Sequence, residues 1–182
     1  METIISSAFC KLRKTTFFLI LLSGISVFAQ KDVFDICRTG SVEELIQLYK
    51  EDSNVINTKN DMGYSPLVLA CYSGNEAVVG FLVDKVKTVN GSYDYGTPLM
   101  AATVKGHTKI VDVLLNHEAN PDLTDSKGGT AGHYAVMFKN YDIIKLLVAA
   151  KADFNIKNNV GKSAMDFVLS YNDSKLNELF KI

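Results

Sequence analysis

The fold of this chain is decided by a six-residue stretch that occurs first as Ser65-Pro66-Leu67-Val68-Leu69-Ala70 and again as Thr97-Pro98-Leu99-Met100-Ala101-Ala102. It returns more loosely as Thr130-Ala131-Gly132-His133-Tyr134-Ala135 and as Ser163-Ala164-Met165-Asp166-Phe167-Val168. The hydroxyl residues that open the four stretches are spaced by 32, 33 and 33 residues. A constant period of this length indicates an architecture of stacked repeats.

Each stretch also predicts local structure. A Ser or Thr followed by Pro favours the start of a helix, because the hydroxyl accepts an unpaired backbone N–H and proline suits the first helical position. Gly74 and Gly106 follow nine residues later, where glycine ends a helix in a left-handed turn. A second apolar run comes next, with the three- and four-residue spacing of one helical face. One such two-helix unit buries its apolar face only by stacking on neighbours.

These residues resemble the ankyrin repeat, whose pattern is Gly-x-Thr-Pro-Leu-His-x-Ala, then Gly-His, then Ile-Val-x-x-Leu-Leu, then Gly-Ala-Asp-x-Asn. The matching segments are Gly106-His107, Ile110-Val111, Leu114-Leu115, Glu118-Ala119-Asn120 and Ala152-Asp153-Phe154-Asn155. The resemblance implies an all-α fold, an ankyrin-repeat solenoid of about five stacked helix-turn-helix repeats with hairpin or loop connections. We assign the repeats to about 31–60, 61–90, 91–125, 126–158 and 159–182.

Two residues depart from the family pattern. Tyr95 stands where the third copy should carry its hairpin glycine, and Gly96 comes one place later. Lys139 replaces the glycine between the two helices of the fourth copy. We therefore expect the third hairpin and the fourth inter-helix turn to differ in geometry from those of the other copies.

Residues 1–29 have the pattern of a signal peptide, and residues 30–182 form the ankyrin-repeat domain. An apolar run over 17–28 follows three basic residues, Lys11, Arg13 and Lys14. The run is shorter than the ~20 residues that a membrane-spanning helix needs. We expect cleavage before Gln30 and export to a bacterial periplasm or secretion, with no stable membrane anchor afterwards. A retained anchor is the alternative.

Charge and cysteine content exclude several classes of protein. The chain has 19 basic and 20 acidic residues, which argues against a nucleic-acid partner, since phosphates call for a clustered basic face. Residues 30–182 keep 16 basic and 19 acidic residues. Cys37 and Cys71 align in adjacent copies, and stacked equivalents ~10 Å apart exceed the ~7 Å limit for a disulfide. We predict two buried free thiols.

No residue pattern indicates catalysis, a metal or a cofactor. The family resemblance gives His107 and His133 structural roles, with hydrogen bonds across turns and to neighbouring repeats. His117 is expected as an exposed residue at a helix end. The chain has no paired-cysteine or His-x-x-x-His metal spacing, no Gly-x-Ser-x-Gly elbow and no glycine-rich phosphate loop. We therefore predict that the protein is not an enzyme.

Aromatic and methionine residues mark the expected binding surface. In the family, partner contacts gather on the hairpin tips and on the exposed end of each first helix. Carried over copy by copy, these places hold the predicted partner-binding residues Met62, Tyr64, Tyr72, Tyr93, Asp94, Lys105, Lys127, Met137, Phe138 and Tyr171. Such residues are enriched at protein interfaces. The alternative is that several of them pack against the next repeat as local core.

The sequence thus predicts a monomeric interaction module that acts outside the cytoplasm. It would bind another protein through its concave face and hairpin tips, as a scaffold or an inhibitor. One alternative is an accessory protein that supports an exported enzyme of oxidative stress, since some exported bacterial ankyrin proteins resemble this chain. A hydrolase built on the repeats is a distant alternative, because it would need a nucleophile and base that the sequence does not offer together.

Overall fold

The computed structural model describes residues 31–91 and 96–182. Residues Lys31–Ile182 form one compact unit. The predicted signal peptide lies outside the described residues, as do Tyr93, Asp94 and Tyr95. Among the described residues, no helix is both long and apolar enough to cross a membrane.

Ten α-helices of the described residues pair in chain order into five layers. The layers are α2 with α3 (Val33–Thr39, Val42–Glu51), α4 with α5 (Pro66–Ser73, Glu76–Val83), α6 with α7 (Pro98–Lys105, Thr108–Asn116), α8 with α9 (Ala131–Met137, Tyr141–Ala149), and α10 with α11 (Ala164–Tyr171, Ser174–Phe180). A short 3-10 helix, η1 (Val55–Asn57), lies between the first and second layers. The predicted all-α repeat solenoid is confirmed.

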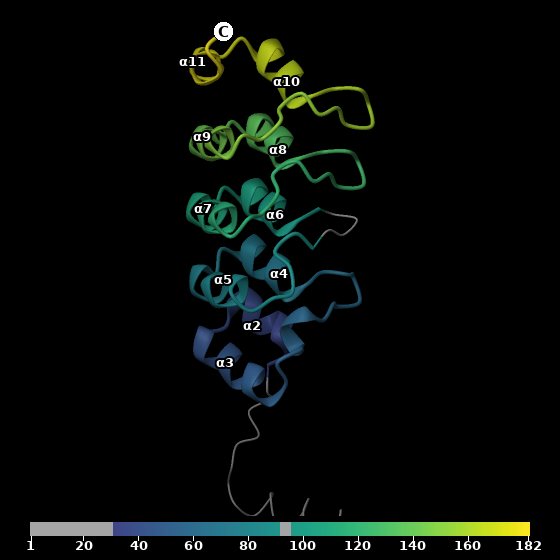
Figure 1. Cartoon of the computed structure of the whole chain (residues 1–182), viewed down its shortest axis with the longest axis vertical. Helices are drawn as coiled ribbons and strands as arrows, with labels where there is room; N and C mark the ends of the chain where they lie inside the picture. Colours follow the sequence, from purple (N-terminus) through teal and green to yellow (C-terminus); the bar gives the residue numbers. More distant parts are fainter. Residues whose placement is uncertain (1–30, 92–95) are drawn as a thin grey trace, which may run out of the picture. The chain divides into compact units, whose positions relative to one another are not determined.

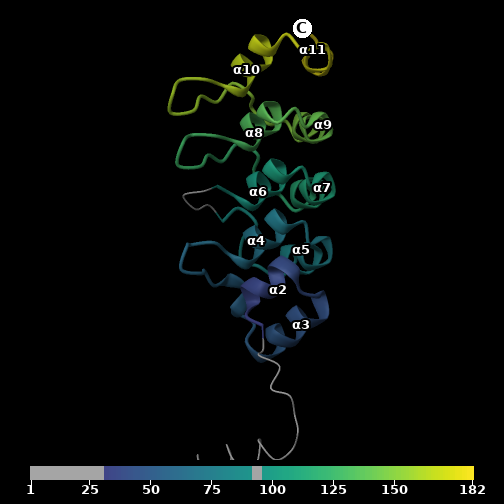
Figure 2. The same cartoon turned by 180° about the vertical axis from the view of Figure 1, so that it is seen from behind.

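The helices stand in two columns (Figure 1). The first helix of every layer lies beside the long loops, and the second helix lies in the column away from them. Seen from behind, the loops again project from the same side of the stack (Figure 2). The ends of the first helices therefore lie next to the loops, which is where the sequence placed the partner-binding residues.

The opening hydroxyl residues cap their helices as the repeat pattern predicted. The side chains of Ser65, Thr97, Thr130 and Ser163 each accept a backbone N–H from the third residue that follows. Pro66 and Pro98 occupy the first turn. Loss of such a cap typically costs ~1 kcal/mol, so the recurring Ser or Thr fixes where each layer begins.

The turns between the two helices of the second to fifth layers share one backbone geometry, whereas Gly40 in the first layer is extended. Gly74 and Gly106 have φ of 78° and 74°, in the left-handed region that glycine adopts freely. Lys139 and Asn172 take the same place in the next two layers, with φ of 51° and 45°. The expectation of a different fourth turn is wrong, because Lys139 adopts the glycine-like conformation despite its Cβ. The expected distortion of the third hairpin concerns residues 92–95, outside the described residues.

One position in each first helix is completely buried in the first four layers. It lies three residues before the turn residue, and its occupants Cys37, Cys71, Thr103 and Val136 are all 0% exposed. In the last layer the same position holds Leu169, which is 61% exposed because no further layer covers it. The predicted burial of both cysteines is confirmed. Burial raises the pKa of the Cys37 thiol to about 12 and raises that of Cys71 as well.

Polar side chains at the starts of the second helices bind successive layers together. Asn75 Nδ2 donates to the Gly40 carbonyl (2.9 Å), and Asn140 Nδ2 donates to the Thr103 carbonyl (3.1 Å). Between them, His107 Nε2 lies 3.3 Å from the Tyr72 carbonyl oxygen. Each contact joins the N-cap residue of the second helix in one layer to the C-terminal end of the first helix in the preceding layer. The predicted structural role of His107 is confirmed.

The other two histidines also join layers. His133 forms a capping box with Thr130, and its Nε2 lies 3.1 Å from the Lys162 carbonyl oxygen, as its predicted structural role requires. His117 lies at the C-terminal end of α7 as expected, but it is half-buried and not exposed. Its Nδ1 bonds to the Val113 carbonyl and its Nε2 lies 3.1 Å from Asp84 Oδ1 in the preceding layer.

Candidate partner-binding surface

The described loops have rigid, equivalent tips. In the loop before α4, Asn60 Oδ1 accepts the N–H groups of Met62 (3.1 Å) and Tyr64 (2.9 Å). Asp125 and Asn158 accept the corresponding pairs of N–H groups in the loops before α8 and α10. A glycine with positive φ completes each turn. The tip side chains, Met62, Lys127 and Val160, are thus held outward by their own backbone hydrogen bonds, and all three are exposed.

The ends of the first helices present a second set of side chains. We call the residues one and two places before each turn residue the helix-end rows, which hold Arg38, Thr39, Tyr72, Ser73, Val104, Lys105, Met137, Phe138, Ser170 and Tyr171. The large apolar members are solvent-exposed: Tyr72 by 51%, Met137 by 45%, Phe138 by 52% and Tyr171 by 36%. Together with the loop tips, the helix-end rows make up what we call the loop-side surface.

An apolar groove of about 510 Å³ opens on the loop-side surface and is lined by residues of the first four layers. Its lining residues are Arg38, Met62, Tyr64, Val68, Leu69, Tyr72, Ser73, Met100, Ala101, Val104 and Tyr134. Val68, Leu69 and Met100 are buried and belong to the layers themselves, whereas Met62 and Tyr72 are exposed. A volume of 300–1,000 Å³ is typical of sites that enclose a ligand or an anchoring side chain. The groove therefore offers a ready-made apolar recess.

The groove brings together three of the predicted partner-binding residues, Met62, Tyr64 and Tyr72. Tyr64 is half-buried and packs on the core, so it serves both as local core and as groove wall. Lys105 stands beside the groove with its Nζ 4.9 Å from the centroid of the Tyr72 ring. A cation over an aromatic face is attracted by the negative charge of the ring.

The other predicted residues lie elsewhere on the loop-side surface. Met137, Phe138 and Tyr171 continue the helix-end rows in the fourth and fifth layers, and Lys127 is an exposed loop tip. Tyr93 and Asp94 lie outside the described residues.

Arg38, Met100 and Tyr134 line the groove although the sequence reasoning did not select them. Arg38 was missed because the first copy lacks the Thr-Pro opening from which the other copies were aligned. Its place two residues before Gly40 matches that of Tyr72 before Gly74, so alignment on the turn glycine would have found it.

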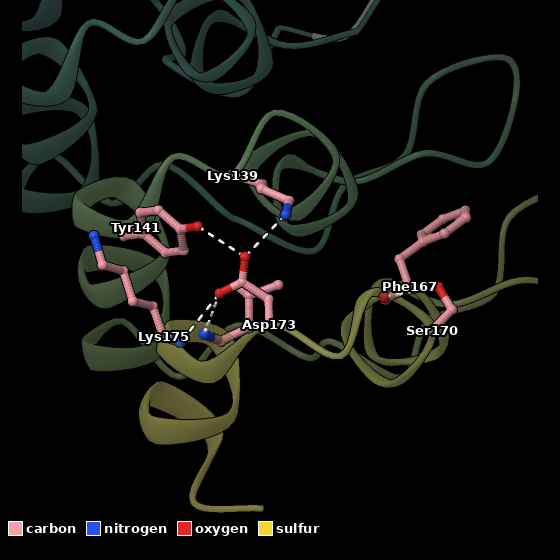
Figure 3. A network of polar contacts seen from close by, with 7 residues as sticks. Lys139, Tyr141, Phe167, Ser170, Asp173 and Lys175 are labelled. Atoms are coloured by element: carbon pink, nitrogen blue, oxygen red, sulfur yellow. Dashed lines mark hydrogen bonds and ion pairs between the residues drawn. The ribbon is translucent and has the colours of Figure 1, made fainter.

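A polar network ties the fourth and fifth layers together on the side of the second helices (Figure 3). Lys139 Nζ and Tyr141 OH both bond to Asp173 Oδ2 at 2.9 Å. The other oxygen of Asp173 caps α11 by accepting the N–H groups of Lys175 and Leu176. The hydrogen bond from Lys139, with further bonds from Tyr141 and the Leu176 N–H, lowers the pKa of Asp173 to about 2.

A second, polar pocket of about 510 Å³ lies against this network, lined in part by Lys145 and Glu178. Lys145 pairs with Asp142 at 3.1 Å, and the ammonium of Lys175 lies 5.1 Å from the centre of the Tyr141 ring. The Lys145–Asp142 pair lies within α9, whereas the contact of Lys175 with Tyr141 joins α11 to α9. In the part of the chain that the structure describes, no three His, Cys, Asp or Glu residues are grouped so that they could hold a metal ion.

Comparison with known proteins identifies the repeat. Residues 86–158 match the family model for ankyrin repeats, three copies. The chain is 31% identical over 128 residues to ankyrin repeat and SAM domain-containing protein 6 of Rattus norvegicus, and 33% identical over 132 residues to an ankyrin repeat protein of fowlpox virus. It is also 33% identical over 107 residues to the nuclear factor NF-kappa-B p105 subunit of Gallus gallus.

These matches cover 68%, 69% and 57% of this chain but only 14%, 38% and 11% of the respective relatives. The chain thus spans well under half the length of the curated proteins to which it is similar. What the matches share with it is the repeat itself.

Proposed function

We propose that this chain, which is built of ankyrin repeats, binds a partner protein on the loop-side surface and acts without catalysis. Ankyrin repeats generally serve as protein–protein interaction modules, and this favours a protein-binding function for the chain. The observation that carries the proposal is the alignment of exposed large apolar side chains along one face. Tyr72, Met137, Phe138 and Tyr171 lie on the helix ends of the second, fourth and fifth layers.

Exposure of these side chains to water is unfavourable unless another molecule covers them. Burial of apolar surface contributes roughly 25 cal/mol per Å², and an aromatic side chain buries about 150–250 Å². Aromatic and methionine residues are enriched at the centres of interfaces for this reason. The loop tips add preorganisation, since their hydrogen bonds already fix the backbone and little conformational entropy is lost on binding.

We place this action outside the cytoplasm, as a scaffold or an inhibitor. The support for export is the basic and apolar pattern of residues 1–29. The partner would then be an exported or secreted protein, held by noncovalent contacts.

Affinity capture from a native extract tests the proposal. We expect Tyr72→Ala and Phe138→Ala each to reduce the recovered partner by about tenfold or more, the size of a ~1.4 kcal/mol interface loss. Val148→Ala serves as the matched control, because Val148 is also an exposed apolar residue (41%) but lies on α9 in the other column of helices.

The control variant should recover the same partner in the same amount as the unmodified chain. Unchanged recovery by both loop-side variants would contradict the proposal, as would an equal loss caused by Val148→Ala. Circular dichroism of each variant confirms that the helices remain folded.

A further inference from the structure

The charge of the helix-end rows differs from that of the chain around them. Residues 30–182 carry 19 acidic and 16 basic residues, yet the ten helix-end positions hold two cations, Arg38 and Lys105, and no carboxylate. Most acidic residues lie instead on the second helices and the connections, as Glu43, Glu76, Asp112 and Asp142 illustrate, and the first helices carry only Asp35 and Asp166. The helix-end rows thus form a locally cationic edge on a chain of net negative charge.

The two cations flank the apolar groove. Arg38 lines the groove from the first layer and is the only charged residue among the described residues that line it. Lys105 belongs to the third layer and covers the Tyr72 ring at its rim. Between them the groove presents Met62, Tyr72 and Val104. An occupant therefore meets an apolar recess with positive charge at either side.

Arg38 retains donors for a further partner. Its Nη1 donates to Asp35 Oδ1 at 3.1 Å, and both side chains are solvent-exposed, by 37% and 58%. A guanidinium has five N–H donors in a fixed plane, so one such bond leaves most of them to meet a second carboxylate. Exposed ion pairs contribute little to stability, and a binding partner can share this one at small cost.

We infer that the apolar groove receives a segment of the partner protein in which a large apolar side chain is flanked by Asp or Glu residues. This inference rests on the proposed function and adds the chemistry of the partner to it. The apolar side chain fills the recess between Met62 and Tyr72, and the carboxylates approach Arg38 and Lys105. A segment with Lys or Arg beside its apolar residue would bring like charges together, which disfavours binding.

Selection from a displayed library of random twelve-residue peptides tests the inference. The full 182-residue chain is immobilised, and the recovered peptides are sequenced before and after selection. We expect enrichment of peptides with a Leu, Met or aromatic residue within two places of Asp or Glu. Enrichment of basic peptides, of peptides without a large apolar residue, or of no peptide at all would overturn the inference.

Charge reversal then locates the contact, with the most enriched peptide synthesised as the probe. The double variant Arg38→Glu/Lys105→Glu should bind it about tenfold more weakly and with less dependence on salt. The matched control is Lys109→Glu/Lys145→Glu, which makes the same charge change at exposed lysines on α7 and α9. The inference fails when the two double variants lose affinity equally, or when neither does.

The outcomes separate this inference from the proposed function. Peptides of another composition that lose binding in Tyr72→Ala would overturn the acidic-apolar chemistry while leaving the loop-side surface as the binding site. Acidic-apolar peptides that bind Tyr72→Ala and the Arg38→Glu/Lys105→Glu variant as well as the unmodified chain would instead count against the surface itself.

Discussion

At the scale of single residues, the fourth turn shows how a side chain can replace glycine. A left-handed backbone costs a residue with a Cβ roughly 1–2 kcal/mol. Lys139 nevertheless adopts it, and its ammonium reaches both Asp173 Oδ2 (2.9 Å) and the Tyr171 ring (5.4 Å to the centroid). The strain at the backbone is offset by contacts to the next layer, which a glycine could not make.

Substitution of Asp173 by Asn tests this offset. The Asn side chain can still cap α11, so Asp173→Asn removes the charge that Lys139 binds and leaves the helix start intact. The pKa of Asp173 is lowered from 3.8 to about 2, so its charge stabilises the folded chain above pH 3.8 and is lost as pH falls toward 2. We expect the variant to be less stable than the unmodified chain at pH 6, and equally stable near pH 2.

Urea unfolding, followed by circular dichroism at several pH values, measures this difference. A stability gap that stays constant between pH 6 and pH 2 would show that the loss comes from the cap and not from the charge. Lys145→Gln is a suitable control, since it removes an exposed lysine whose Asp142 partner lies within its own helix. Its effect should remain small across the same range.

The contact between Lys139 and Asp173 also shows what the sequence does not predict about single residues. The Ser and Thr caps and the turn glycines were predictable, because each acts within a few residues along the chain. Lys139 and Asp173 are 34 residues apart, and other hydrogen bonds between layers join residues from 28 to 37 apart in the sequence. The sequence alone left Lys139 as an anomaly, since the partner that explains it is brought near only by the stacking of layers.

At the scale of the helices, the residue three places before each turn decides how layers adhere. Its side chain is fully buried in the first four layers and mostly exposed in the fifth. Because the local sequence environment is similar throughout, the difference comes from the presence or absence of a following layer. Burial at this position is thus a property of the stack, and a helical pattern read within one copy does not predict it.

A matched pair of substitutions at this position measures the contribution of stacking. Val136→Ala, at a fully buried site, should lower the free energy of unfolding by about 2 kcal/mol through lost burial and a residual cavity. Leu169→Ala removes more atoms from an exposed site and should change stability by about 0.5 kcal/mol or less. Chemical denaturation of both variants gives the comparison. A larger loss for Leu169→Ala would mean that its side chain is covered in solution.

The sequence predicted only part of the candidate binding surface. The repeat period placed Tyr72, Met137, Phe138 and Tyr171 on helix ends, and the structure leaves them exposed there. The groove itself was not predictable, because its walls come from four layers and include Arg38, Met100 and Tyr134. Tyr134 also bonds to Asp125, and burial together with that bond raises the pKa of its hydroxyl to about 12. Whether such a residue lines the groove depends on how neighbouring repeats pack against one another.

At the scale of the whole molecule, the described layers form a quasi-linear stack in which each contacts only its neighbours. Stability in such a stack is the sum of layer terms and interface terms, so an end layer can detach while the others stay folded. Cys37 is completely buried on α2 of the first layer, and Cys71 is completely buried on α4 of the second. The two thiols therefore report on two successive layers.

Thiol labelling follows the opening of these interfaces. With Cys10 replaced by Ser, we expect both thiols to resist a thiol-specific reagent at pH 8, because they are completely buried and burial raises the pKa of Cys37 to about 12. At low urea concentrations Cys37 should react before Cys71, since Cys37 belongs to the end layer and Cys71 to the second layer. Mass spectrometry of proteolytic fragments assigns the label to each site. Equal labelling rates at every urea concentration would show instead that residues 31–182 open in a single cooperative step.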